Sequence, residues 1–274
     1  MSTSPQKIAA FRQTVQAHAR THKRIVMPWR TTRDPYAILV SEFMLQQTQV
    51  ERVINYYESF LAHFPDFSSL VAASNTEVLT AWQGLGYNRR ALNLKKTAET
   101  VVREFESILP RDPPTLEKLP GIGHATARAI AAFAFNAPVV FIETNIRRAF
   151  LYHFFPRTRA VDDRTILPLI AAAHPRKNSR AWYYALMDYG AALGKQTRQN
   201  PNRRSRHYTR QGRFAGSNRE LRGRIIRILL EKHTLTASSL AKKLNESDTR
   251  LAPILLALQN EKFIQKNGTS FSLT

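Results

Sequence analysis

Between residues 38 and 193 the chain is a succession of segments whose apolar residues recur with the spacing of an α-helix, and alternating strand patterns are nearly absent. Glycines and prolines separate these segments, as at Gly84, Gly86 and Pro138. Helices of this kind bury one face against other helices rather than against a sheet. The pattern therefore predicts a mainly α domain.

The expected helices of this region follow one another closely. The segment 38–60 is interrupted by four polar residues at 46–49, and Thr76 is the expected N-cap of a short helix that ends before the two glycines. The predicted helices span residues 38–60, 76–82, 88–105, 126–135, 145–154, 165–173 and 180–193.

The last part of the chain has a different pattern. Residues 220–232, 237–244 and 248–262 are amphipathic, and two short alternating segments flank Asn267-Gly268, a strong hairpin-turn signal. Three helices followed by a hairpin predict a winged helix-turn-helix domain. The alternative is a small helical cap that binds nothing; DNA contact is favoured because a basic segment leads directly into this domain.

The basic charge of the chain is unevenly distributed. Lysine and arginine number 41 against 20 acidic residues, a formal net charge of +21, so a polyanion such as nucleic acid or an acidic membrane face is the expected partner. Residues 195–227 hold eleven of the basic residues and a single acid. Few large apolar residues occur between Gln196 and Ser217, so we expect a linker or a DNA-binding strap rather than core here, with Arg203, Arg204 and Arg206 on DNA phosphates. The expected domains are residues 1–194, a basic linker at 195–216, and 217–274.

The composition excludes several classes of chemistry. The chain has no cysteine, which rules out disulfides, thiolate metal sites, cysteine nucleophiles and cysteine-ligated iron–sulfur clusters. The histidines are scattered without ligand spacing, so no transition-metal site is expected; the alternative is a monovalent or divalent ion held by carbonyl oxygens of the turn at residues 121–123. No apolar run is long enough for a membrane span, and the first five residues do not resemble a signal peptide. A cytoplasmic monomer is expected, associated with the nucleoid if the source is bacterial.

One short segment has the pattern of an anion-binding turn. Gly121, Ile122 and Gly123 precede an alanine-rich helix that includes Thr126. Two glycines two residues apart let backbone N–H groups face outward at a helix N-terminus, a geometry suited to a DNA phosphate. Such a turn is also often only a tight connection, but Leu119, Ile122 and the threonine make this one resemble a helix-hairpin-helix motif.

A series of further motifs identifies the family that the chain resembles. In order, these are Pro28-Trp29-Arg30, Asp34-Pro35-Tyr36, Ser41-Glu42-Phe43-Met44-Leu45-Gln46-Gln47-Thr48-Gln49, Gly84-Leu85-Gly86-Tyr87, the hairpin, and Phe141-Ile142-Glu143-Thr144-Asn145-Ile146-Arg147-Arg148. From about residue 28 to 193 this succession resembles the helix-hairpin-helix DNA glycosylases, and within them the MutY-type adenine glycosylases. The resemblance implies a two-lobed helical fold.

The resemblance also implies the catalytic residues. Breaking an N-glycosidic bond requires an acid that protonates the base and a carboxylate that stabilises the sugar cation. By resemblance, Glu42 is the acid, and burial in its apolar segment should raise its pKa. Glu143 stands where the family usually has an aspartate, although it could instead only cap a helix. Asn145 matches an active-site asparagine that orients this carboxylate or binds a phosphate.

Other matched positions imply how DNA is held and what the product is. Gln46, Gln47, Thr48 and Tyr87 match positions that enter the duplex around a flipped nucleotide, with Tyr87 as ordinary core the alternative. Trp29 and Arg30 match the edge of the base pocket. Ala125 occupies the position of the Schiff-base lysine of bifunctional relatives. The resemblance therefore implies base removal without efficient strand cleavage.

Two departures from the family limit this interpretation. Where relatives carry four cluster-binding cysteines, this chain has Gly194, Pro201, Arg204 and Arg210, so no iron–sulfur cluster and no other cofactor are expected. The C-terminal region is also no obvious substitute for the larger domain that reads 8-oxoguanine. We expect a monofunctional enzyme that removes adenine opposite guanine or 8-oxoguanine from double-stranded DNA in base excision repair. The alternatives are a glycosylase for another mispaired or damaged base, such as thymine or uracil opposite guanine, and a non-catalytic DNA-binding regulator.

Overall fold

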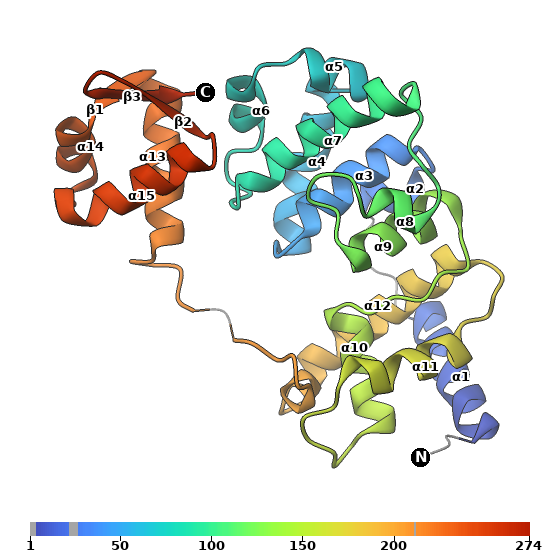
Figure 1. Cartoon of the computed structure of the whole chain (residues 1–274). Helices are drawn as coiled ribbons and strands as arrows, with labels where there is room; N and C mark the ends of the chain where they lie inside the picture. The colour runs from blue at the N-terminus through green and yellow to red at the C-terminus, as the bar shows by residue number, and fades with distance from the viewer. Residues whose placement is uncertain (1–3, 22–26, 211) are drawn as a thin grey trace. The chain divides into compact units, whose positions relative to one another are not determined.

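The computed structural model describes residues 4–21, 27–210 and 212–274, and it is mainly helical (Figure 1). Contacts divide the chain into two compact units. The first consists of the described residues up to Glu42 together with Leu109–Arg210, and the second of Phe43–Ile108 with the described residues from 212 onward. Of the predicted linker 195–216, Gln211 lies outside the described residues. No helix in the described ranges is long and apolar enough to cross a bilayer.

The first unit is built on four helices that lie side by side, α1, α10, α11 and α12 (Figure 1). The bounds of its elements are α1 (Pro5–Thr21), α2 (Pro28–Thr31), α3 (Pro35–Leu45, continuing past Glu42), α8 (Pro113–Leu116), α9 (His124–Phe135), α10 (Thr144–Phe154), α11 (Asp163–Ala173), α12 (Ser179–Gln196) and the 3₁₀ turn η1 (Pro201–Arg204).

Aromatic side chains from several helices fill the core of this unit. The centre of the Phe11 ring on α1 lies 4.8 Å from the centre of the Phe150 ring on α10 and 6.5 Å from that of the Trp182 ring on α12. Ile8, Phe11 and Val15, spaced three and four residues apart, form the buried face of α1. Sequence analysis did not predict α1, although this spacing is typical of an amphipathic helix.

The helices of residues 43–108 have a core of their own in the second unit. They are α4 (Val50–His63), α5 (Phe67–Ala72), α6 (Asn75–Ala81) and α7 (Arg89–Phe105), and α7 packs against α5 and α6. The side chains of Phe60, Leu70, Trp82 and Leu94 are fully buried there.

The C-terminal part of the second unit combines three helices with a small sheet. Its elements are α13 (Asn218–Lys232), β1 (Thr234–Thr236), α14 (Ala237–Leu244), α15 (Asp248–Asn260), β2 (Ile264–Asn267) and β3 (Ser270–Leu273). The sheet is antiparallel in the order β1-β3-β2, with Leu235 opposite Phe271 and Lys266 on the other side of Phe271. The helices and the hairpin are as predicted, whereas β1 was not expected.

Most of the predicted helices are confirmed with ends shifted by a few residues, and the polar residues at 46–49 separate α3 from α4. The predicted N-cap Thr76 is wrong. Ser74 caps α6 instead, because its hydroxyl accepts from the Glu77 backbone N–H at 3.2 Å while the Glu77 carboxylate accepts from the Ser74 N–H at 2.7 Å. The short helices α5 and α8 were not predicted.

Candidate active site and DNA-binding surface

Glu42 is a carboxylic acid inside an otherwise apolar helix. The α3 residues before it, Ile38, Leu39 and Val40, are buried, so the whole helix is enclosed by protein rather than lying on the surface. The pKa of Glu42 is raised to about 8, first by burial and then by the negative charge of Glu143, while Arg30 partly opposes both. Because the side chain still keeps some accessible surface, it can exchange a proton with a ligand or with water.

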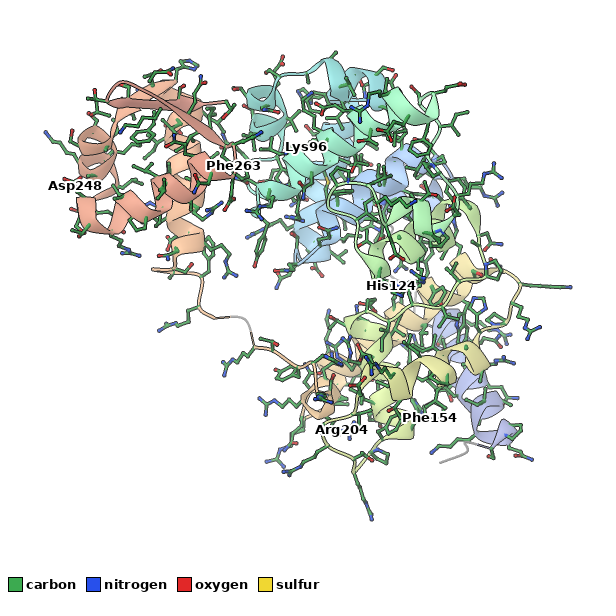
Figure 2. All side chains as sticks on the ribbon, in the orientation of Figure 1. Lys96, His124, Phe154, Arg204, Asp248 and Phe263 are labelled. Atoms are coloured by element: carbon green, nitrogen blue, oxygen red, sulfur yellow. The ribbon has the colours of Figure 1, made fainter. Side chains whose placement is uncertain are left out.

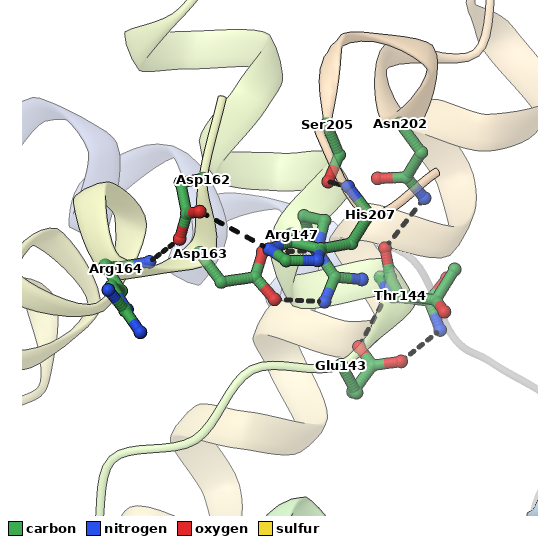
Figure 3. Close-up of polar contacts among 10 residues, drawn as sticks. Glu143, Thr144, Arg147, Asp162, Asp163, Arg164, Asn202, Ser205 and His207 are labelled. Carbon is green, nitrogen blue, oxygen red and sulfur yellow. Dashed lines mark hydrogen bonds and ion pairs between the residues drawn. The ribbon is translucent and has the colours of Figure 1, made fainter. Parts of the chain in front are cut away.

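Glu143 lies at the N-terminus of α10 and caps it. Its Oε1 accepts hydrogen bonds from the backbone N–H groups of Asn145 at 2.7 Å and Ile146 at 2.6 Å, and its Oε2 accepts from Asn145 Nδ2 at 3.3 Å. Figure 3 shows the Glu143 carboxylate with its dashed contacts at the start of this helix. Burial raises the pKa of Glu143 overall, and the backbone N–H donors and the positive charges of Arg148 and Arg147 only partly oppose this. The capping interpretation of Glu143 is thus observed, and it leaves the carboxylate within a set of donors that favour its charged form.

The two carboxyl groups have environments that assign them different protonation states. Glu42 is dominated by burial, and the charge on Glu143 opposes its ionisation. Glu143 is surrounded by N–H groups and guanidinium charge. Burial raises both pKa values, but within the described ranges only Glu143 of the two has N–H donors that favour its charged form, so it is the better placed to carry a charge. Glu42, with a pKa of about 8, keeps its proton near neutral pH, and this contrast fits the division of labour between an electrostatic stabiliser and a general acid.

An ion pair between Arg30 and Asp188 lies near Glu42. Arg30 donates to Asp188 through two hydrogen bonds of 2.8 Å, and its guanidinium lies 4.4 Å from the centre of the Tyr184 ring. The charge of Glu42 also contributes to raising the pKa of Tyr184 to about 12. Sequence analysis found Arg30, and Trp29 beside it is buried, but it missed Tyr184 and Asp188. Tyr184 and Asp188 are four residues apart and so lie on the same face of α12, and this spacing is the sequence pattern that could have revealed them.

Close packing of α10 on α12 holds Asn145 in place. Arg148 Nη1 donates to Asn145 Oδ1 and to the carbonyl of Gly190, both at 2.8 Å. A Cβ atom at Gly190 would overlap the carbonyl oxygen of Asn145, and one at Gly194 would lie 2.7 Å from Arg148 Nη1. Glycine at both positions therefore lets the two helices approach.

The helix-hairpin-helix segment forms the turn that the sequence predicted. Gly121 has a positive φ of 79°, Ile122 is buried, and Gly123 is the N-cap residue of α9 without a side-chain cap. An ion pair between Glu117 and Arg128 ties α8 to α9 across this turn. Gly121 and Gly123 are exposed, and Thr126 lies in the first turn of α9 with its side chain partly buried.

In the second unit, a buried arginine joins the two loops that were predicted to enter the duplex. Arg90 donates to the carbonyl oxygens of Met44 at 2.7 Å and Gly86 at 2.9 Å and to Thr48 Oγ1 at 3.0 Å, and it has further bonds to Phe43 and Leu85. Burial lowers the pKa of Arg90 to about 10. Arg90 was not among the residues predicted from the sequence, because its bonding partners Phe43 and Met44 are distant in the chain.

The predicted duplex-entering residues lie on backbone that is unusual for their residue types. Gln47 and Tyr87 both have a positive φ, of 55° and 48°, a region that non-glycine residues occupy infrequently. Gln47 is exposed, whereas Gln46, Thr48 and Tyr87 are partly buried. Such conformations persist only where surrounding bonds hold them, and the bonds of Arg90 supply that support.

The basic segment that begins at residue 195 is partly packed into the first unit. Pro201, Asn202 and Ser205 are buried, which corrects the expectation that no part of this segment belongs to the core. Polar groups achieve this burial through hydrogen bonds, which hydropathy does not reveal. Arg204, labelled in Figure 2, donates to the carbonyl oxygens of Pro156 at 2.6 Å and Leu151 at 3.1 Å. Arg203 and Arg206 are exposed.

The residues of this segment do not suit an iron–sulfur cluster, because the sequence contains no cysteine to supply thiolate ligands. Within the described ranges, no group of three or more histidine, cysteine or acidic residues is placed to hold a metal ion.

Comparisons with known proteins identify the family of the chain. Residues 40–166 match the family described as HhH-GPD superfamily base excision DNA repair protein. The adenine DNA glycosylase of Mycolicibacterium smegmatis is 36% identical over 231 residues, which cover 78% of each chain. That of Buchnera aphidicola subsp. Baizongia pistaciae is 35% identical, covering 67% of this chain and 52% of that protein, and the human adenine DNA glycosylase is 40% identical, covering 52% and 28%.

Solved structures show the same fold. A thermostable thymine-DNA glycosylase superposes with a TM-score of 0.63 at 25% identity, covering 71% of this chain and 91% of that one. A non-covalent complex of endonuclease III with DNA superposes at 0.61 and 17% identity, with 72% and 91% coverage. The chain belongs to the HhH-GPD superfamily of base excision DNA repair proteins and is a DNA glycosylase. The relatives that match it over most of its length are named adenine DNA glycosylases.

Proposed function

We propose that the chain is a monofunctional DNA glycosylase that removes adenine from a mispair with guanine or 8-oxoguanine. The observation that carries the proposal is the pair of carboxyl groups, Glu42 and Glu143: burial keeps the proton on Glu42, and three N–H donors surround the Glu143 carboxylate. The adenine assignment rests on relatives that share 36% and 32% identity with this chain over more than three quarters of its length.

In the proposed reaction Glu42 gives its proton to the purine ring as the bond between the ring nitrogen and C1′ breaks. The bonding electrons leave with the base, and positive charge develops on the sugar. The Glu143 carboxylate stabilises that charge, and Asn145 fixes the carboxylate through its amide. Water then adds to C1′ and gives its proton to the Glu42 carboxylate, which restores the acid. Ala125 offers no amine to attack the sugar, so an abasic site is the product.

DNA binding in this proposal uses several separate elements. The hairpin residues Gly121, Ile122, Gly123 and Thr126 bind a phosphate, and Gln46, Gln47, Thr48 and Tyr87 enter the duplex. Trp29 and Arg30 border the base. Arg203 and Arg206 contact phosphates from exposed positions, whereas Arg204 contributes by anchoring the segment to α10.

The C-terminal residues 217–274 are proposed to form a winged helix domain that follows a basic linker at 195–216 and a glycosylase domain at 1–194. The order of helices and strands from α13 to β3 supports this assignment. We further propose that the protein acts as a monomer on double-stranded DNA in the cytoplasm.

The experiment is a single-turnover assay on duplexes that pair adenine with guanine, 8-oxoguanine or thymine, and thymine or uracil with guanine, with alkali added to cut abasic products. Adenine should be released opposite guanine or 8-oxoguanine and remain opposite thymine. Glu42→Gln should lower the rate constant by about 10²–10⁴-fold and Glu143→Gln by about 10²–10³-fold, with duplex binding retained.

Release of thymine or uracil instead would replace the adenine assignment, an outcome that the structural likeness to a thymine-DNA glycosylase makes worth testing. Binding of every duplex with no release from any would indicate a non-catalytic DNA-binding regulator.

A further inference from the structure

The segment that follows α12 makes specific bonds to the helix that carries Glu143. We call residues 197–206 the clamp segment. It passes along α10, with Asn200 and Asn202 bonded to the first half of the helix and Arg204 to Leu151 near its other end. Figure 3 shows the contact between Asn202 and Thr144, the residue that directly follows Glu143.

The first connection is direct. Asn202 Nδ2 donates to the carbonyl oxygen of Thr144 at 3.0 Å, and the asparagine side chain is buried. Its Oδ1 is also buried and has no hydrogen-bond partner among the described residues. A buried amide with an unbonded oxygen is an unfavourable choice for packing alone. An asparagine at position 202 is explained if the Nδ2 donor of the same side chain has a function.

The second connection passes through an arginine. Asn200 Oδ1 accepts from Arg148 Nε at 3.2 Å and from the backbone N–H of Asn202 at 3.1 Å. Arg148 in turn bonds Asn145 Oδ1 at 2.8 Å, and Asn145 bonds Glu143. The first connection therefore ends on Thr144, which stands between Glu143 and Asn145 in the chain, and the second ends on Asn145, which bonds the Glu143 carboxylate.

We propose that Asn200 and Asn202 are positioning residues, which fix the first turn of α10 and thereby the Glu143 carboxylate for base excision. The proposal rests on the role proposed above for Glu143. The two asparagines do not contact Glu143 themselves. They act through Thr144 and Arg148, so their loss should change how fast the base is released and leave duplex binding as it is.

The test uses the full chain with Asn202→Leu, a variant of similar size that removes the donor and the unbonded oxygen together. The matched control is Thr197→Val, which removes another side-chain bond of the clamp segment, the 2.6 Å bond to the carbonyl of Leu193 on α12. We expect Asn202→Leu to lower the single-turnover rate constant about 10–100-fold with unchanged duplex affinity and thermal stability. Thr197→Val should keep the wild-type rate.

The pH dependence of the rate separates positioning from general stability. Glu143 is faced by Arg147 and Arg148 on its own helix, and it interacts with Glu42 on α3. If the turn shifts, the N–H bonds of Asn145 and Ile146 to Glu143 weaken, so its carboxyl gains a proton at a higher pH. The acidic limb of the rate profile should then move to higher pH in Asn202→Leu and stay in place in Thr197→Val.

A second pair of variants decides the question if Asn202→Leu does not fold. Asn200→Asp keeps the acceptor for Arg148 and should retain the rate, whereas Asn200→Leu loses it and should be slow. A wild-type rate and pH profile in the leucine variants would overturn the positioning role while leaving the glycosylase assignment intact. Failure of the wild-type chain itself to release a base would instead overturn the proposed function.

Discussion

Replacing Glu42 with glutamine should produce a protein that is more stable than the wild type near neutral pH and inactive. Glutamine keeps the shape of the protonated glutamic acid but has no proton to lose. The wild-type side chain is enclosed by protein, and its pKa in the folded chain is raised to about 8 from an ordinary value of 4.5. Stability and activity should therefore change in opposite directions on this single substitution.

The magnitude follows from proton linkage. Because the folded chain keeps a proton that the unfolded chain releases, this group's contribution to stability is present in full below pH 4.5 and is lost progressively up to about pH 8. The loss is about 1.4 kcal/mol per pH unit, or about 3 kcal/mol at pH 7. We reduce this to about 2 kcal/mol because part of the side chain remains accessible to water. Glutamine does not ionise, so the variant does not lose stability in this way as the pH rises.

Urea unfolding of the wild type and Glu42→Gln, followed by circular dichroism at several pH values, measures this gain. The control is Glu58→Gln, which changes an exposed glutamate of α4. The gain for Glu42→Gln should be close to zero near pH 4.5, grow with pH and level off above about pH 8. A gain of equal size at every pH would show that packing is responsible. A loss of stability at pH 7 would refute the buried-acid argument altogether.

Three further substitutions test the packing around the site. Arg90→Met should lower the free energy of unfolding by about 2–5 kcal/mol, measured by urea unfolding, because the carbonyls of both loops lose their donor; a change below about 1 kcal/mol would contradict the role of Arg90 in joining them. Gly190→Ala should destabilise the chain by about 1–3 kcal/mol and slow excision, because the new Cβ overlaps the Asn145 carbonyl. The control is Gly223→Ala, in open space on α13, which should stabilise the chain by about 0.5–1 kcal/mol. Equal effects of the two substitutions on the free energy of unfolding would refute the close approach of α10 and α12. Glu143→Asp should retain the helix cap and measurable excision in a single-turnover assay, since aspartate is a preferred capping residue; complete loss of excision would show that the site depends on the longer side chain.

The sequence was sufficient to predict the parts of the molecule whose geometry is local. The hairpin turn at Gly121 and Gly123 depends on backbone freedom within a few residues. The burial of Glu42 is visible in the apolar residues beside it, and the cap formed by Glu143 lies at the start of its own helix. Each of these features requires only neighbours in the chain.

The missed residues all depend on partners that are distant in sequence. Arg90 bonds carbonyls more than forty residues away, and Asp188 pairs with Arg30 across 158 residues. Asn202 looked like part of a solvated basic segment because hydropathy registers its polarity and not its bond to Thr144. Composition cannot distinguish a polar side chain in water from one that is buried and bonded.

The different surroundings of the two carboxyl groups mean that they should control opposite ends of the pH dependence. Glu42 must be protonated to act, so the rate should fall as pH rises above about 8. Glu143 must be charged, so the rate should fall in acid, and the bonds that hold the first turn of α10 set where that occurs. Substitutions along α10 and the clamp segment should therefore move mainly the acidic limb, and substitutions that alter the packing of α3 mainly the alkaline limb, with a smaller effect on the other limb through the repulsion between the two carboxyl groups. A single substitution in the clamp segment that moved both limbs equally would show that the two carboxyl groups respond to one shared environment.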